Sequence, residues 1–143
     1  MNQSRLRLAV VGLFVDSNEV LMLHQMTFPE PDCWDLPGGG LEPHESLLEG
    51  LQREVKEETG IENFTIEKLL TVAESFFPEG EGNFLHTVNV IYQCSVHPKP
   101  LSFSIDEMEI GAKGVQWLPI EQLNPQICSQ RSWQALKVFQ TGV

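Results

Sequence analysis

Three glutamates lie close together near the middle of this sequence, Glu54, Glu57 and Glu58. In a helix, a rotation of about 100° per residue places Glu57 about 60° to one side of Glu54 and Glu58 about 40° to the other. The three carboxylates then share one face within a single turn. Carboxylates at these spacings destabilise a helix by a few tenths of a kcal/mol per pair, so this face needs a source of positive charge.

The apolar pattern predicts a helix over residues 45–58. Leu48, Leu51 and Val55 recur at spacings of three and four residues, which is the period of an amphipathic helix. Gly60 follows, and glycine can take the left-handed conformation that ends a helix. The three glutamates are therefore expected on a helix.

A hard divalent cation would supply the missing charge. Carboxylate oxygens are preferred ligands of Mg²⁺, which keeps several waters and so leaves positions for phosphate oxygens. A bound cation also lowers the pKa of a water and takes up charge that develops on a phosphoryl oxygen, as hydrolysis of a phosphoanhydride requires. The alternative is a solvated acidic helix face, and the flanking residues decide between the two.

Those flanking residues resemble the Nudix hydrolase signature. The family pattern is Gly, five residues, Glu, seven residues, Arg-Glu-apolar, one residue, Glu-Glu, one residue, Gly-apolar, and residues 39–61 match every specified position. With each fixed residue type at roughly 5–7% usage, a chance match is on the order of one in a billion per starting point. Residues 34–40 and 115–120 are also similar to family segments.

Residues 39–61 are called the box below. The resemblance implies a role for each of its specified residues. It implies that Gly39 offers a backbone carbonyl to the metal, and that Arg53 and Glu45 form a buried or half-buried pair that supports the helix and its loops. The general base stays open between Glu54, Glu57 and a loop carboxylate. Three carboxylates are implied as ligands of Mg²⁺, with Mn²⁺ as a substitute: Glu54, Glu57 and Glu58.

Two positions near the box are unusual. His44 stands where family members commonly have glycine, so the geometry of that turn is open. Gly50 lies inside the predicted helix, where glycine costs about 1 kcal/mol relative to alanine. We expect close packing of Gly50 against the sheet or a loop.

The rest of the sequence predicts an α/β (α+β) fold, an α/β/α sandwich with a mixed β-sheet, in a single domain over residues 1–143. The density of proline and glycine over 28–44 predicts a constrained loop. The other expected elements are a hairpin of strands 5–15 and 19–26, strands 64–77, 84–96 and 114–118, and a helix over 129–140 with Ser129 as N-cap.

Groups outside the box are expected to select the substrate. Residues that could stack on a base are Phe28, Trp34, Phe76, Phe77, Phe84 and His86. Residues that could supply a further carboxylate are Glu79, Glu81, Asp106, Glu107 and Glu109, of which the cluster over 106–109 is favoured.

Composition limits the partners. The formal net charge of -11 disfavours binding to a nucleic acid polymer, and a small polyanion would need a bound cation.

The apolar run 8–15 is too short to cross a bilayer. Cys33, Cys94 and Cys128 form no CxxC pair, so reduced thiols, a cytoplasmic location and no membrane association are expected. The sequence leaves a monomer and a homodimer open.

The expected activity is metal-dependent hydrolysis of a phosphoanhydride bond in a nucleoside diphosphate linked to another group. Nucleoside triphosphates, including damaged ones, are the first expected substrates, followed by ADP-ribose and dinucleoside polyphosphates. The alternative is a catalytically silent Nudix module that senses a nucleotide. Loss of a box glutamate would favour this alternative, and none is lost.

Overall fold

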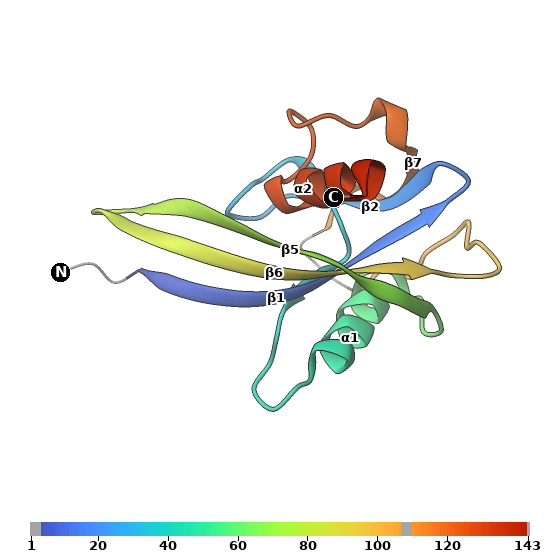
Figure 1. The fold of residues 1–143 in the computed structure, drawn as a ribbon, viewed down its shortest axis with the longest axis horizontal. Helices are drawn as coiled ribbons and strands as arrows, with labels where there is room; N and C mark the ends of the chain where they lie inside the picture. Colours follow the sequence, from blue (N-terminus) through green and yellow to red (C-terminus); the bar gives the residue numbers. More distant parts are fainter. Residues whose placement is uncertain (1–3, 107–109, 143) are drawn as a thin grey trace.

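A mixed sheet with one long helix on each face makes up the fold, which confirms the predicted sandwich (Figure 1). The computed structural model describes residues 4–106 and 110–142. In chain order the elements are β1 (Arg5–Asp16), β2 (Glu19–Gln25), β3 (Cys33–Asp35), β4 (Gly38–Gly40), α1 (Leu47–Thr59), β5 (Thr65–Gly80), β6 (Asn83–Ser95), β7 (Ile110–Pro119), a 3₁₀ turn (Ile120–Gln122) and α2 (Gln130–Thr141).

Strand β1 is the centre of the sheet. It runs parallel to β6 from Arg5 opposite Leu85 to Phe14 opposite Cys94, and antiparallel to β4. The expected hairpin with β2 is correct in position, but β1 and β2 pair only next to their turn, because β2 turns away to pair with β3 and β7. Strand β5 pairs antiparallel with β6.

Alternation along β1 builds a core on each face of the sheet. Val10 and Phe14 pack with Leu51 and Val55 of α1, whereas Val11 and its neighbours pack against α2. Helix α2 contributes Ala135 to this second core together with Trp133, Leu136 and Phe139, the stripe that recurs every three residues in the sequence. No helix in the described ranges 4–106 and 110–142 is long and apolar enough to cross a membrane.

The helix ends follow local sequence signals. In α1, Ser46 accepts a hydrogen bond from the backbone of Glu49, whose side chain in turn accepts one from the backbone of Ser46. Gly60 ends the helix with a φ of 83°. Ser129 caps α2 as predicted.

Strand ends agree less well with the sequence patterns. The loop over 28–44 contains β3 and β4, each three residues long, and β5 continues to Gly80 instead of stopping at residue 77. Strand β7 begins at Ile110, before the expected residue 114. In each case, pairing with a neighbouring strand extends the element beyond its local sequence pattern.

The two unusual positions near the box have structural consequences. His44 has a φ of 67°, in the left-handed region that favours glycine. A Cβ on Gly50 would lie 2.4 Å from Leu41 Cδ2 and 3.3 Å from Val10 Cγ1, which confirms close packing against both loop and sheet.

A buried ion pair attaches α2 to β3. The guanidinium of Arg131 donates to both carboxylate oxygens of Asp35, from Nε at 3.1 Å and Nη2 at 2.8 Å. The hydroxyls of Ser129 and Ser132 also donate to Asp35. Burial alone would raise the pKa of Asp35, but the charge and hydrogen bonds of Arg131 and the two hydroxyls hold it below its ordinary value.

We predict that Asp35→Asn lowers the free energy of unfolding by about 3–5 kcal/mol, because it leaves the buried Arg131 without the carboxylate that it contacts directly. Urea denaturation measures the loss. The matched control is Lys56→Gln, which breaks the exposed pair with Glu62 and should cost about 0–1 kcal/mol. Equal losses in the two variants would contradict a stabilising role of the buried pair.

The same pair predicts a dependence on pH. The folded-state pKa of Asp35 is lowered, so its contribution is present above the unfolded value of about 3.9 and is lost as the pH falls through the folded value. The difference in stability between wild type and Asp35→Asn should therefore shrink below about pH 4.

Candidate functional site

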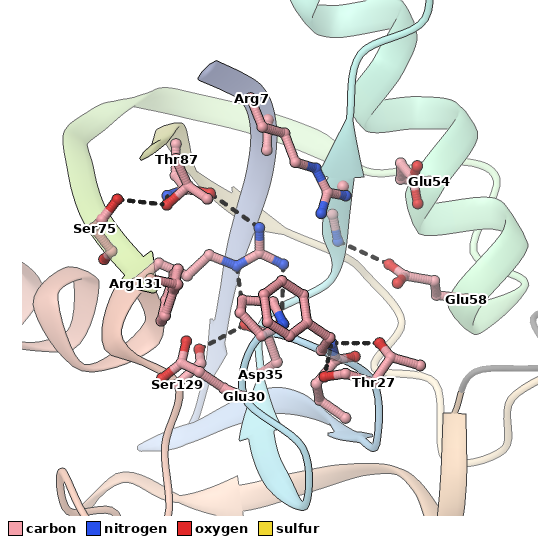
Figure 2. A pocket seen from close by; sticks show the side chains of 18 residues that line it. Arg7, Thr27, Glu30, Asp35, Glu54, Glu58, Ser75, Thr87, Ser129 and Arg131 are labelled. Carbon is pink, nitrogen blue, oxygen red and sulfur yellow. Dashed lines mark hydrogen bonds and ion pairs between the residues drawn. The ribbon is translucent and has the colours of Figure 1, made fainter. Parts of the chain in front are cut away.

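A cavity of about 430 Å³ lies between the second half of α1 and the N-terminus of α2, over the face of β1, β5 and β6 that carries α2 (Figure 2). Its size is typical of small-molecule sites. Glu54, Glu58, Gly38 and Gly39 line one side. The predicted acidic helix therefore contributes to a cavity wall.

The three predicted glutamates are not equivalent. Glu54 and Glu58 line the cavity, but Glu57 does not. The side chain of Glu57 is 39% exposed and its carboxylate lies 3.4 Å from Arg53 Nη1. The helix thus presents two of its three carboxylates to the cavity and holds the third beside a guanidinium.

Arg53 connects the helix to the preceding loop. It donates to Glu45 from Nε at 2.6 Å and from Nη2 at 2.9 Å, so the predicted pair is present. It also donates to Glu54 at 3.0 Å and to the carbonyl of Gly40 at 3.1 Å. The hydrogen bonds from Arg53 lower the pKa of Glu45 to about 2.

Glu58 is a buried carboxyl group held by the backbone of β4. The residue is 8% exposed, and its Oε1 accepts a hydrogen bond from Gly38 N–H at 2.8 Å. Burial raises the pKa of Glu58 well above its ordinary value. A Cβ on Gly38 would lie 2.3 Å from the carbonyl oxygen of Val10, so glycine is required for this approach.

Gly39 brings the backbone against Glu54. A Cβ at this position would lie 2.7 Å from both Cδ and Oε1 of Glu54, and any larger residue would displace the carboxylate. Gly39 also pairs with Val10 in the sheet, which fixes its position. The glycines of β4 therefore determine where both cavity-facing carboxylates lie.

The donor chemistry on the α1 side of the cavity suits a hard divalent cation, because the groups that α1 presents there are carboxylate oxygens. In the ranges 4–106 and 110–142, no three histidine, cysteine or acidic side chains are arranged to hold a metal ion as they stand. The contacts of Arg53 with Glu54 and Glu57 explain this, since they direct these two carboxylates to the guanidinium. Metal binding would require the carboxylates to turn toward one another.

Two of the six residues proposed to stack on a base line the cavity, Phe28 and Phe77. Phe76 and His86 instead stack on each other, with ring centroids 4.2 Å apart. Trp34 packs against the core beneath α2. Phe84, the last of the six, is exposed.

The acidic loop residues lie in three places. Glu79 pairs with Arg5, and Glu81 sits in the turn between β5 and β6 with a φ of 53°. The backbone N–H of Asp106 donates to the carbonyl of Glu57 at 2.7 Å, so the favoured cluster begins next to α1. The other two members of this cluster, Glu107 and Glu109, lie outside the described residues.

The sequence patterns missed most of the other polar residues of the cavity. The missed residues include Arg7, Glu30, Asp35, Ser75, Thr87, Asn89, Ser129 and Arg131. One signal was present in the sequence: Thr87 and Asn89 are polar residues on the inward face of an apolar strand. Inward polar residues in a buried strand need partners, so they mark a polar cavity or a network.

We predict that Arg53→Lys raises the pKa of Glu45 from about 2 toward the ordinary value of about 4.3, because lysine cannot reproduce the bidentate contact. Carboxyl ¹³C chemical shifts followed by NMR across pH measure this pKa. Glu49 is the internal control, since hydrogen bonds with Ser46 lower its pKa. An unchanged Glu45 pKa would rule out Arg53 as the cause.

This chain is similar in sequence to several known proteins. Nudix hydrolase 6 of Arabidopsis thaliana is 31% identical over 127 residues, which cover 85% of this chain and 42% of that protein. The ADP-ribose pyrophosphatase of Methanocaldococcus jannaschii is 32% identical over 88 residues, 62% of this chain and 50% of that protein. The 8-oxo-dGDP phosphatase NUDT18 of Homo sapiens is 41% identical over 66 residues, 46% of this chain and 20% of that protein. The chain thus spans half or less of the length of these relatives.

The fold has close counterparts among solved structures. A MutT NUDIX hydrolase from Burkholderia pseudomallei superposes with a TM-score of 0.75 over 94% of this chain and 98% of that one, at 24% identity. The family model described as the NUDIX domain matches residues 5–139. This chain therefore belongs to the Nudix family.

Proposed function

We propose that this chain hydrolyses a phosphoanhydride bond in a nucleoside diphosphate derivative, with a divalent metal ion held by Glu54, Glu57 and Glu58. The observation that carries the proposal is the pair of carboxylates, Glu54 and Glu58, in the wall of a ligand-sized cavity. Glu58 is buried, and a buried carboxylate beside a second acidic group is costly unless a cation offsets its charge. The cation that neutralises them also attracts a phosphate.

Each residue of the box has its own role in metal binding or catalysis. Glu54 and Glu58 would hold the metal from the cavity side, and Glu57 would be the third ligand once released from Arg53. Gly39 adds its backbone carbonyl, and Glu45 fixes Arg53, which orients the ligand carboxylates. The bound ion, Mg²⁺ or alternatively Mn²⁺, supplies an activated water and takes up charge on the phosphoryl group. Glu54 or Glu57 is the candidate general base within the box.

The substrate is a small nucleotide. Arg7 lines the cavity beside Gly40, where its guanidinium lies over the backbone next to the glutamates (Figure 2). This position suits a contact with a substrate phosphate. The names of two relatives, an 8-oxo-dGDP phosphatase and an ADP-ribose pyrophosphatase, support nucleoside phosphates, damaged ones included, and ADP-ribose as the first substrates to test.

The decisive experiment is a substrate screen with Mg²⁺ or Mn²⁺. The compounds are nucleoside triphosphates and diphosphates, their 8-oxo forms, ADP-ribose and dinucleoside polyphosphates. A phosphatase added after the reaction releases inorganic phosphate from the products, and this phosphate is measured. Glu58→Gln should lower kcat by at least about a hundredfold on any substrate found. Glu62→Gln, an exposed carboxylate just after α1, is the control and should leave kcat unchanged. Nucleotide binding without turnover in the wild type would favour the sensing module instead.

Glu58→Gln should also separate metal binding from folding. Glutamine can still accept the Gly38 hydrogen bond but carries no buried charge, so the metal-free variant should unfold at the same temperature as the wild type or higher. Added Mg²⁺ should raise the unfolding temperature of the wild type and not of the variant. An equal rise in both proteins would remove Glu58 from the metal site.

We further predict that Gly39→Ala lowers turnover while the protein stays folded. The added Cβ would lie 2.7 Å from the Glu54 carboxylate, which is the far end of a flexible side chain and can move. Turnover should fall at least about tenfold, with a circular dichroism spectrum like that of the wild type. Full activity in this variant would show that the position of Glu54 is not critical.

A further inference from the structure

One end of the sheet projects beyond both helices. This end holds the start of β1 and the turn between β5 and β6, at the left of Figure 1. On one of its faces, Arg7, Ser75 and Thr87 line the cavity. Large apolar side chains are exposed on the same three strands, and we call them the apolar sheet face: Leu6, Leu8, Val72, Phe76 and Phe84.

Strand register places these apolar side chains on the side of the sheet opposite the cavity. Leu6 of β1 pairs with His86 of β6, which pairs with Phe76 of β5. Paired residues point to the same side of a sheet, and so does Leu8, two residues along β1 from Leu6. Val10, two residues farther, packs against α1. The apolar sheet face is therefore the part of the α1 side that α1 leaves uncovered.

The charge within this face is balanced locally. Glu74 Oε2 lies 2.8 Å from Nε2 of His86. The rings of His86 and Phe76 stack with centroids 4.2 Å apart and an interplanar angle of 15°. Because the chain has a formal net charge of -11, two copies approach each other at the least electrostatic cost through such a face. A basic partner would instead be drawn to the acidic parts of the surface.

The exposed apolar area is close to what a dimer of ordinary size needs. Leu6 is 71% exposed and Phe76 is 56% exposed. The apolar sheet face exposes roughly 400–500 Å² in all, if a whole aromatic side chain is taken as about 150–250 Å² and leucine and valine as somewhat less. A standard interface takes about 800 Å² from each partner, of which about 56–65% is apolar. The face therefore supplies the apolar part of one half of such an interface.

The free edge of β5 is less suited to a second copy than the face. Strand β5 is the last in the order β3-β2-β1-β6-β5, so its outer edge pairs with no strand in the ranges 4–106 and 110–142. However, its ladder with β6 is irregular at three places, and β5 contains Pro78. Bulges and proline protect an edge strand from pairing with another chain.

We propose that two copies of this chain form a dimer in which their apolar sheet faces pack against each other about a twofold axis. A twofold contact uses the same patch on both copies, so a single apolar face is sufficient. Two sheets packed in this way lie about 10 Å apart. The inference is independent of the proposed function, because the cavity opens on the other side of these strands.

Analytical ultracentrifugation of the full chain at increasing concentration tests the dimer. The wild type should sediment as a dimer and Leu6→Glu as a monomer, because the substitution would bury an uncompensated carboxylate from each copy. The matched control is Leu101→Glu, which adds the same charge at an apolar residue that is 85% exposed and lies outside the sheet. This control should remain a dimer.

A second variant removes apolar area without adding charge. Phe76→Ser should raise the dissociation constant of the dimer at least about a hundredfold, because each copy loses an exposed phenyl ring from the interface. Thermal unfolding gives an independent measurement. The unfolding temperature of the wild type should rise with protein concentration, and that of Leu6→Glu should not.

Three results would overturn the inference. A wild type that stays monomeric at the highest concentration would leave the apolar sheet face to a different protein. A dimer that survives both Leu6→Glu and Phe76→Ser would place the interface elsewhere. Dissociation of Leu101→Glu as well would show that added negative charge, and not this face, separates the copies. The proposed function does not depend on these results, since the substrate screen tests it separately.

Discussion

The clustering of carboxylates around the guanidinium of Arg53 is the interaction on which this site depends. Glu45, Glu54 and Glu57 all contact Arg53, and the same side chain reaches the carbonyl of Gly40. One fixed positive charge thus holds acidic groups from a loop and a helix close together without a metal. A planar group with five donors in a fixed geometry can do this, whereas the ammonium of lysine cannot.

The structural features that the sequence patterns predicted correctly involve residues that are close together in the chain. Helix α1 with its terminal Gly60 and the Ser129 cap of α2 follow from spacings within about 20 residues, whereas the pair of Arg53 with Glu45 was implied by the family resemblance. The family resemblance also fixed the fold class correctly. Helical period could not show that Glu57 turns from the cavity while Glu58 enters it, because this depends on how α1 sits at the edge of β4.

The rest of the cavity depends on contacts between distant residues. Asp35 and Arg131 are 96 positions apart, and their pairing requires α2 to dock beside β3. Ser75 looks unremarkable in an alternating strand, and only the register of β1, β6 and β5 places it in a row with Arg7. Periodicity predicts the face of a residue, but it contains no information on register between strands far apart in the chain.

The parallel pairing of β1 with β6 has a consequence for biosynthesis. Arg5 lies opposite Leu85, so the central strand has its main partner 80 residues later (85 − 5). Such non-local parallel contacts form slowly, and chains emerge at about 5–20 residues per second. For several seconds the apolar strand β1 is therefore a nascent segment without its principal neighbour, and the strong negative charge of the chain would protect it from aggregation during that interval.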